Sequence, residues 1–364
     1  MRKKRPDFIL LFTILALVLS GLIMILSASS IKAEQLFSNS YYFFNNQLKY
    51  LVVAVIISLV IYKFKYEKLK NLAAYLLLIA LGFLILVLIP GVGRMAGGSR
   101  RWLPLGPISF QPSEFAKFTL VIYLAAYIAK NKEQMKKFKE GILPPIIVIA
   151  LIAFLILMEP DLGTAVTLSA VAAAMIFVGG IKISLFLILG VSATLISFAA
   201  IFSEAYRRER LLTFLNPWQD PLDSGYHIIQ SLLALGSGGL FGVGAGNSHQ
   251  KFLYLPEPGT DFIFAVLGEE FGLIGTLFVI SLYFVLTWRG LRIAARVDDP
   301  FASMLAVGIT SMIVIQALIN MAVVTSLMPV TGITLPLISY GGSSLVINLT
   351  ALALLLNISC YVKG

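Results

Sequence analysis

Residues 8–26 read FILLFTILALVLSGLIMIL and contain no charged side chain. A helix of this length, at about 1.5 Å per residue, nearly matches the ~30 Å hydrocarbon core of a bilayer. The stretch therefore predicts a membrane-spanning helix. The basic residues 2–5 precede it as they would in a signal peptide, but the apolar run is too long for one, so we expect an uncleaved first span.

Nine more apolar runs follow, near 47–63, 71–90, 113–130, 143–158, 162–180, 183–203, 262–288, 302–325 and 343–362. Of the 364 residues, 59% are hydrophobic and only 13% charged, whereas a soluble domain carries about 25% charged residues. The mean hydropathy is +0.92. This composition excludes a soluble enzyme. It predicts an all-α, polytopic integral membrane protein whose residues 1–364 form one domain of ten transmembrane helices.

The distribution of charge predicts the orientation in the membrane. With the N-terminus in the cytoplasm, 18 of the 28 Lys and Arg residues but only 6 of the 18 Asp and Glu residues fall on the cytoplasmic side. This asymmetry is the one that cytoplasmic loops show, and an even number of spans places both termini there. The net charge of +10 is thereby explained without a nucleic-acid partner.

The external loops are the long ones, at 91–112, 326–342 and 204–261, the last between the seventh and eighth spans. Loops of this length in a compact domain are usually functional. We therefore expect the activity at the external face of the cytoplasmic membrane.

The largest loop contains two further signals. Asp223-Ser224 is suited to cap a short, half-apolar helix that ends at Gly236. The glycines of 236–246 do not have the spacing of a nucleotide-binding loop, so they indicate close packing or a re-entrant turn. His227 and His249 have no cysteine nearby, and the lone Cys360 lies in the last apolar run, so neither a metal site nor a disulfide is predicted.

Ionisable residues at membrane depth are costly and each is a candidate for function. Glu114 and Lys117 lie one helical turn apart, either as a neutralising pair or on the wall of a cavity open to the outside. Glu269 and Glu270 lie in the eighth span, where they have either a functional role or a structural one. Asp261 stands where the long loop meets that span, so it is either an N-cap or a general base.

Arginines on the external side require an explanation, because Lys and Arg normally collect in the cytoplasmic loops of membrane proteins. Arg101, Arg208 and Arg210 either pair with loop carboxylates or contact phosphate oxygens. Trp102 either stacks on a sugar or sits at the membrane interface.

These stretches resemble one known family. They are GSRRW (98–102), FQPSEFAK (110–117), EPDLGT (159–164), PEPGTDFIFAVLGEE (256–270) and PLISYGGSS (336–344). In this order they resemble the SEDS family, the shape, elongation, division and sporulation proteins, over essentially the whole chain. The double arginine and the final Gly-Glu-Glu resemble the division branch, whereas Pro258-Gly259 resembles sporulation-type relatives.

The resemblance implies a peptidoglycan glycosyltransferase that polymerises lipid II, an undecaprenyl-pyrophosphate-linked disaccharide-peptide, at the outer face of the membrane. It implies that Asp261 is the essential aspartate and that Glu114 and Lys117 are the family's ion pair. It also implies a complex with a class B penicillin-binding protein and other division proteins. No cofactor is certain. Arg101, Arg208, Arg210 or a divalent cation would take up the charge of the leaving pyrophosphate.

A lipid II flippase and a non-catalytic division scaffold are the alternative functions. The candidate substrate-binding or cavity-lining residues beside Asp261 are Arg101, Trp102, Gln111, Ser113, Glu114, Lys117, Arg208, Arg210, Thr260, Glu269, Ser339, Gly341 and Ser343.

Overall fold

A computed structural model describes residues 5–96, 99–106, 108–202, 205–221, 225–251 and 255–362. Residues 2–4, Gly98 of the first motif, the expected cap Asp223-Ser224 and the side chain of Arg210 lie outside the described part.

Helices make up most of the chain. They are α1 (Phe8–Phe37), α2 (Tyr42–Lys63), α3 (Glu67–Leu88), α4 (Pro112–Lys130), α5 (Leu143–Met158), α6 (Leu162–Val178), α7 (Ile183–Phe202), α8 (Ala205–Leu215), α9 (Tyr226–Gly238), α10 (Ile263–Arg296), α11 (Pro300–Val324) and α12 (Gly342–Ser359). Single turns occur at Gln134–Lys136, Phe138–Ile142 and Pro217–Gln219.

A helix lies in each of the ten ranges predicted to span the membrane. Within the described residues, seven helical stretches are long and apolar enough to cross a bilayer: α1, α2, α3, α10, α11, α12 and Phe138–Met158, which contains α5. Helix α6 has only 17 residues, and α4 carries Glu114 and Lys117 near its start. The molecule is a multi-span membrane-type protein, and the count of ten crossings stays a prediction.

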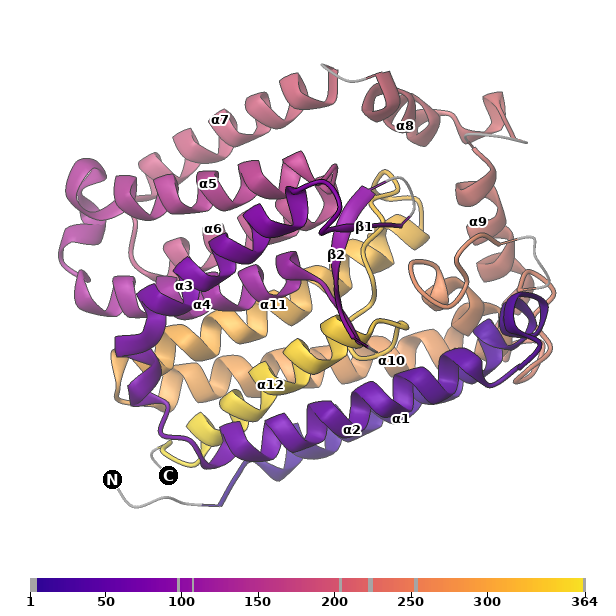
Figure 1. Cartoon of the computed structure of the whole chain (residues 1–364), viewed down its shortest axis with the longest axis horizontal. Coiled ribbons are helices and arrows are strands. Elements are labelled where there is room, and N and C mark those ends of the chain that lie inside the picture. The colour runs from indigo at the N-terminus through magenta and orange to yellow at the C-terminus, as the bar shows by residue number, and fades with distance from the viewer. Residues whose placement is uncertain are drawn as a thin grey trace.

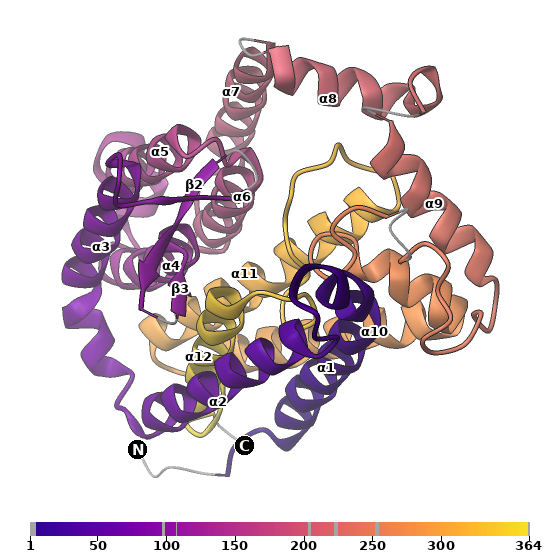
Figure 2. The ribbon, with the colours of Figure 1, turned by 45° about the vertical axis from the view of Figure 1, so that its right-hand side comes forward.

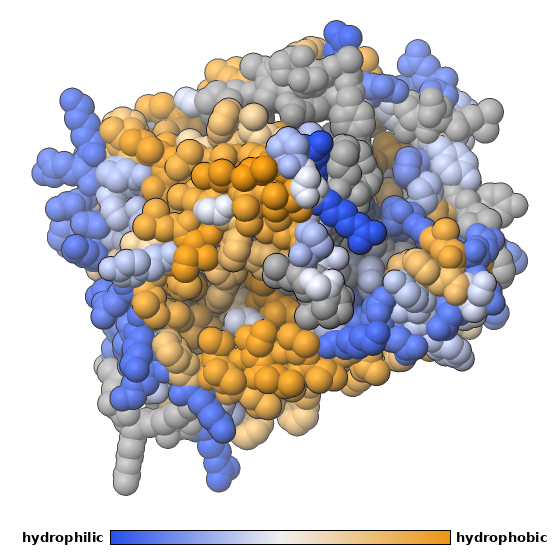
Figure 3. All heavy atoms as spheres, in the orientation of Figure 1, coloured by the Kyte–Doolittle hydropathy of each residue, from blue (hydrophilic) through white to orange (hydrophobic). Residues whose placement is uncertain are grey.

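The long helices lie side by side, with both termini at one end of the bundle and the strands with α8 and α9 at the other (Figure 1). We call these the terminal end and the loop end. Orange side chains cover most of the middle of the face in Figure 3, and blue side chains gather at the two ends. Large side chains such as Phe12, Leu78 and Phe284 are exposed on the outside. An apolar belt between two polar ends is what a bilayer requires.

The core lies around α11 and α12. In the most apolar 18-residue window of each helix, 78% of α12 but only 11% of α2 is buried. Helix α2 packs along α12, and α11 packs against α4, α6 and α10. Helix α7 stands at the edge of the bundle and leads directly into α8 (Figure 2).

A small antiparallel sheet at the loop end was not predicted, so the all-α prediction is wrong for 94–110. Its strands β1 (Arg94–Ala96), β2 (Ser99–Leu105) and β3 (Ile108–Phe110) are arranged in the order β1-β2-β3. Strands this short carry too little alternation to be recognised in the sequence.

The long loop contains one helix that was predicted and one that was not. Helix α9 ends at Gly238 rather than Gly236 and packs against α10. Helix α8 had no prediction. Close packing is confirmed for two of these glycines: a Cβ on Gly238 would lie 2.0 Å from the carbonyl oxygen of Gly268, and one on Gly242 would lie 2.2 Å from that of Glu270. A Cβ on Gly236, Gly239 or Gly246 would meet nothing within 4 Å.

Helix α10 is interrupted at Gly272, whose φ of 65° and ψ of −161° are not helical. After this kink Leu273 N–H donates to Gly239 O at 2.9 Å. At Gly238 and Gly242 the chain thus lies directly on the backbone of α10, and no side chain larger than hydrogen fits at these two positions.

We expect Gly238→Ala to destabilise the protein by about 1–3 kcal/mol, because the added methyl group overlaps the α10 backbone. Gly82→Ala is the matched control: Gly82 lies within α3 and its Cβ would meet nothing within 4 Å, so alanine there is neutral or stabilising. Thermal unfolding in detergent measures both, and equal midpoints for the two variants would contradict the packing.

Candidate functional site

Asp261 lies in the turn that leads into α10 and is half-buried. Its main-chain oxygen accepts a hydrogen bond from Asn320 Nδ2 of α11 at 2.8 Å. Its carboxylate oxygen Oδ2 lies 3.6 Å from the point where a side chain on Gly332 would begin. The carboxylate therefore faces the loop 326–341, and the glycine leaves room for it.

The loop 326–341 is fastened to the residues just before Asp261. Ser339 Oγ donates to Thr260 O at 2.5 Å and accepts from Leu335 N–H at 2.8 Å. Tyr340 N–H donates to Gly259 O at 2.9 Å. Of the predicted residues, Thr260, Ser339 and Asp261 are thus brought together.

A second group joins the start of α12 to its neighbours. Ser343 Oγ donates to Ser109 O at 2.9 Å and accepts from Gln111 N–H at 3.1 Å. Gly341 N–H donates to Gln47 Oε1 of α2 at 3.2 Å. Gln111, Gly341 and Ser343 therefore tie the sheet and α2 to the loop that faces Asp261.

Glu114 and Lys117 form the predicted ion pair, with 2.8 Å between Lys117 Nζ and Glu114 Oε1. Their side chains are only 7% and 4% exposed. The ammonium also donates to Gln316 Oε1 at 2.5 Å. Ser113 beside them is buried, and its hydroxyl has no partner among the described residues. A buried pair of this kind has a large desolvation cost, so it depends on these extra bonds.

Arg101 extends from β2 to the turn between α5 and α6. Its guanidinium donates to Pro160 O at 2.5 Å, and Nε lies 3.5 Å from Asp161 Oδ2. Neighbouring Trp102 is half-buried on the same strand. Arg101 therefore holds the sheet against this turn, which is the alternative of pairing with loop carboxylates.

Glu159 in the same turn is fully buried, and neither carboxylate oxygen has a hydrogen-bond partner among the described residues. Burial and the neighbouring carboxylate of Asp161 raise the pKa of Glu159, the guanidinium of Arg101 lowers it, and the net result is a pKa of about 8. The carboxyl is therefore protonated at neutral pH.

Glu269 and Glu270 are buried just before the kink in α10. Glu269 accepts hydrogen bonds from Ser248 Oγ and from the N–H of His249. Glu270 pairs with Lys251 at 2.9 Å and accepts from Ser27 Oγ of α1 at 2.5 Å. Both glutamates thus anchor the segment 248–251.

Arg208 is exposed on α8, which packs against α7 and the turn Pro217–Gln219. Arg210 is on the same helix. The backbone of both residues therefore lies on the part of the long loop that follows α7.

One cavity lies near the site and another lies at the opposite end of the molecule. A small one of about 30 Å³ lies beside the turn before Asp261 and is lined by Ser29, Lys32, Phe43, Glu257, Pro258, Gly259, Thr260 and Tyr340. Lys32 pairs with Glu257 at its edge, at 2.7 Å. Burial, with Tyr50 and Tyr42 nearby, raises the pKa of Tyr340 to about 12, so its hydroxyl stays protonated.

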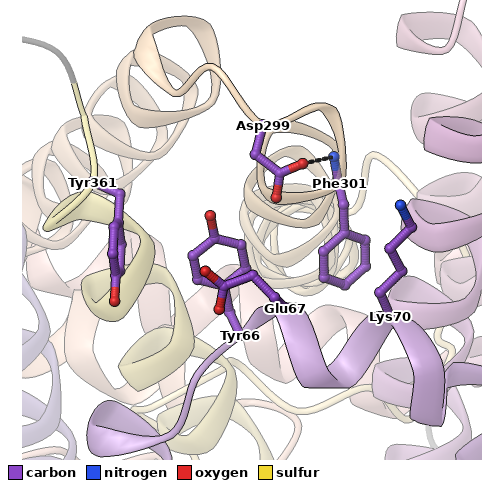
Figure 4. A pocket seen from close by; sticks show the side chains of 6 residues that line it. All are labelled: Tyr66, Glu67, Lys70, Asp299, Phe301 and Tyr361. Atoms are coloured by element: carbon purple, nitrogen blue, oxygen red, sulfur yellow. Dashed lines mark hydrogen bonds between the residues drawn. The ribbon is translucent and has the colours of Figure 1, made fainter. Parts of the chain in front are cut away.

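A larger cavity of about 320 Å³ lies at the terminal end (Figure 4). It is lined by Tyr66, Glu67, Lys70, Asp299, Phe301 and Tyr361. Asp299 accepts from Phe301 N–H at 3.2 Å as the N-cap of α11, and Glu67 begins α3. These carboxylates have a local role at helix starts, and the cavity contains none of the predicted site residues.

Within the described residues, no three His, Cys, Asp or Glu side chains are grouped closely enough to hold a metal ion.

Sequence reasoning missed Gln316 and Asn320, the two amides that connect α11 to the site. A signal was present: they lie four residues apart in an otherwise apolar helix. Amide side chains in membrane helices usually hydrogen-bond to a neighbouring element.

Comparisons with known proteins agree with this architecture. The family profile of FtsW, RodA and SpoVE, described as "Cell cycle protein", matches residues 8–364. Stage V sporulation protein E of Bacillus subtilis is 45% identical over 100% of this chain and 99% of its own length. A probable peptidoglycan glycosyltransferase FtsW of Geobacter sulfurreducens is 41% identical over 99% and 97% of the two chains.

Solved structures show the same fold. A chain from "Structural coordination of polymerization and crosslinking by a peptidoglycan synthase complex" superposes with a TM-score of 0.80 at 28% identity, covering 97% of both chains. The rod shape determining protein RodA of Thermus thermophilus gives a TM-score of 0.71 at 29% identity, over 97% and 96% of the chains.

We expect stability to fall as the pH rises from about 5 to 8. The folded state holds the proton of Glu159 while the unfolded chain releases it near its ordinary pKa, so deprotonation favours unfolding. Glu159→Gln keeps the neutral form, so its unfolding midpoint should change less over this range, with a gain of about 1–3 kcal/mol at pH 8. Identical pH profiles for both proteins would contradict a buried, protonated Glu159.

Glu114→Ala should destabilise the protein by about 3–5 kcal/mol, because it leaves the ammonium of Lys117 buried without its carboxylate. Replacing Glu114 by leucine and Lys117 by methionine together removes both charges and should restore much of that loss. Unfolding midpoints in detergent compare the two proteins. A double variant no more stable than the single one would indicate that the charges are needed individually.

Proposed function

Because the chain belongs to the FtsW, RodA and SpoVE family of cell cycle proteins, the SEDS family, we propose that it is a peptidoglycan glycosyltransferase that polymerises lipid II. Relatives that align along almost the whole chain are named probable peptidoglycan glycosyltransferases. The supporting observation in the structure is the position of Asp261, half-buried at the loop end and fastened by its backbone to α11.

Asp261 acts as the general base in this proposal. Its carboxylate takes the proton from the 4-hydroxyl of the acceptor sugar, and the oxygen attacks the anomeric carbon of the donor. The bond between that carbon and the pyrophosphate breaks, and undecaprenyl pyrophosphate leaves with the bonding electrons. One displacement inverts the α-linked donor into a β-linked product, so a single carboxylate suffices.

The leaving pyrophosphate needs positive charge nearby. Arg101 already donates to Pro160 O and lies beside Asp161. Arg208 is exposed on α8, so we assign the role to the arginines of α8 or to a divalent cation carried by the substrate. The exposed apolar belt supplies the surface along which a prenyl tail approaches (Figure 3).

We further propose that the loop end faces outward from the cytoplasmic membrane, as the excess of Lys and Arg in the other loops indicates. A class B penicillin-binding protein is the expected partner, since one similar structure belongs to a complex that coordinates polymerization with crosslinking. Septal wall synthesis during cell division is the proposed role. The 45% identity to a sporulation protein makes sporulation the alternative role.

Asp261→Asn should abolish glycan polymerisation, with a loss of at least about 10³-fold in kcat, because the amide cannot accept the proton. The assay uses purified protein with its transpeptidase partner and lipid II in detergent, and gels of the glycan chains. The product should persist when the transpeptidase site is blocked.

Glycan chains of normal length from Asp261→Asn would refute the mechanism. Scrambling of lipid II across vesicles without polymer would indicate a flippase. If neither activity occurs and Asp261→Asn supports growth, the protein is a scaffold.

A further inference from the structure

Helix α11 carries two buried amide side chains, Gln316 and Asn320, each 1% exposed. They lie four residues apart and so project from the same face of the helix. The catalytic scheme above gives neither of them a task. Both donate their amide hydrogens to consecutive residues of the loop that faces Asp261.

Gln316 connects the ion pair of α4 to that loop. Its Oε1 accepts from Lys117 Nζ at 2.5 Å, and its Nε2 donates to Thr334 O at 3.0 Å. An ammonium group only donates hydrogen bonds, so Lys117 requires the oxygen of the amide. The nitrogen is thereby turned toward the loop. The charge of Lys117 thus decides which end of Gln316 meets Thr334.

Asn320 connects the same loop to Asp261. Its Nδ2 donates to Ile333 O at 2.7 Å and to Asp261 O at 2.8 Å. One amide nitrogen therefore bridges two main-chain carbonyls, that of Asp261 itself and that of Ile333 in the loop that faces it. Its Oδ1 is buried with no partner among the described residues, so both bonds of this side chain serve the bridge.

These contacts form one continuous chain. It runs from Glu114 to Lys117, Gln316 and Thr334, then through the adjacent Ile333 to Asn320 and the backbone of Asp261. We propose that Gln316 and Asn320 are positioning residues that transmit the geometry set by the Glu114–Lys117 pair to the carboxylate of Asp261. This inference rests on the proposed role of Asp261 as the base.

The physical reason is the narrow distance range of proton transfer. A general base has to lie within about 2.6–3.2 Å of the hydroxyl that it deprotonates, and a misplacement of about 1 Å can lower the rate about 100-fold. Loss of the Asn320 amide leaves two carbonyls without their donor and removes the bond to the main chain of Asp261 itself, while the bonds of Ser339 to Thr260 and of Tyr340 to Gly259 remain. The carboxylate of Asp261 is therefore held less firmly without unfolding of the loop.

The chain contains a matched control at its other end. Asn357 of α12 is also 1% exposed. Its Nδ2 also bridges two carbonyls, those of Tyr62 and Phe64, the latter at 3.1 Å, and its Oδ1 also lacks a described partner. Alanine at 320 or at 357 thus removes the same group from the same kind of contact, but only one of the two touches the site.

The experiment measures lipid II polymerisation by the purified full chain with its transpeptidase partner, at a temperature where every variant is folded. Asn320→Ala should lower kcat about 10- to 100-fold while KM changes less than about 3-fold. Asn357→Ala should leave kcat within about 3-fold of the parent protein. Equal losses from the two variants, or a change in KM alone, would overturn the proposal.

A second set tests the link to the ion pair and does not depend on Asn320→Ala folding. Gln316→Glu keeps an acceptor for Lys117 but has no hydrogen to donate to Thr334, so its kcat should fall about as far as that of Gln316→Leu. Combining Lys117→Met with Gln316→Leu should lose little beyond the worse single variant, because both substitutions break the same chain of contacts and leucine adds no charge beside Glu114. Fully multiplicative losses would overturn the coupling.

Asp261→Asn is assayed in parallel to separate the two proposals. If Asp261→Asn polymerises normally, the proposed base is wrong, and the positioning role fails with it. If Asp261→Asn is inactive while Asn320→Ala behaves like Asn357→Ala, the base stands and only the positioning role is refuted.

Discussion

Polar groups buried in a low-dielectric bundle must find partners, and this constraint shapes the loop end of the molecule. Water does not compensate a carbonyl or an ammonium there, so each depends on a hydrogen-bond or ion-pair partner from the protein. Lys117 has both Glu114 and the oxygen of Gln316. The loop 326–341 lies where it does because its carbonyls are the acceptors that the amides of α11 require.

The same constraint gives the site its rigidity. The turn before Asp261 is bonded through Gly259 and Thr260 to the loop, and through its own carbonyl to Asn320. Asp261 as a residue remains half-exposed. For the proposed reaction, a base on a rigid turn is suitable because two membrane-held substrates leave the enzyme only the reacting sugars to orient.

Close contact between backbone segments is the second feature that stabilises the loop end. Gly238, Gly242 and Gly272 bring the segment after α9 onto the kink in α10, and Glu269 and Glu270 fasten the following residues 248–251. The long loop is therefore anchored on α10, the helix that follows Asp261. This explains why two adjacent carboxylates are buried beside a chain of small residues.

The sequence by itself determined the membrane class, the positions of the helices, the pairing of Glu114 with Lys117 and the close packing of the glycines, because each depends on local composition or on neighbours one turn apart. Asp261 was a candidate general base because it precedes an apolar run and because of the family resemblance. Only the tertiary structure decided the sheet at 94–110, the contact of Arg101 with Pro160, and the bridge from Gln316 and Asn320 to the loop. These contacts join residues far apart in the chain, and no periodicity in the sequence encodes which distant carbonyl a buried amide will meet.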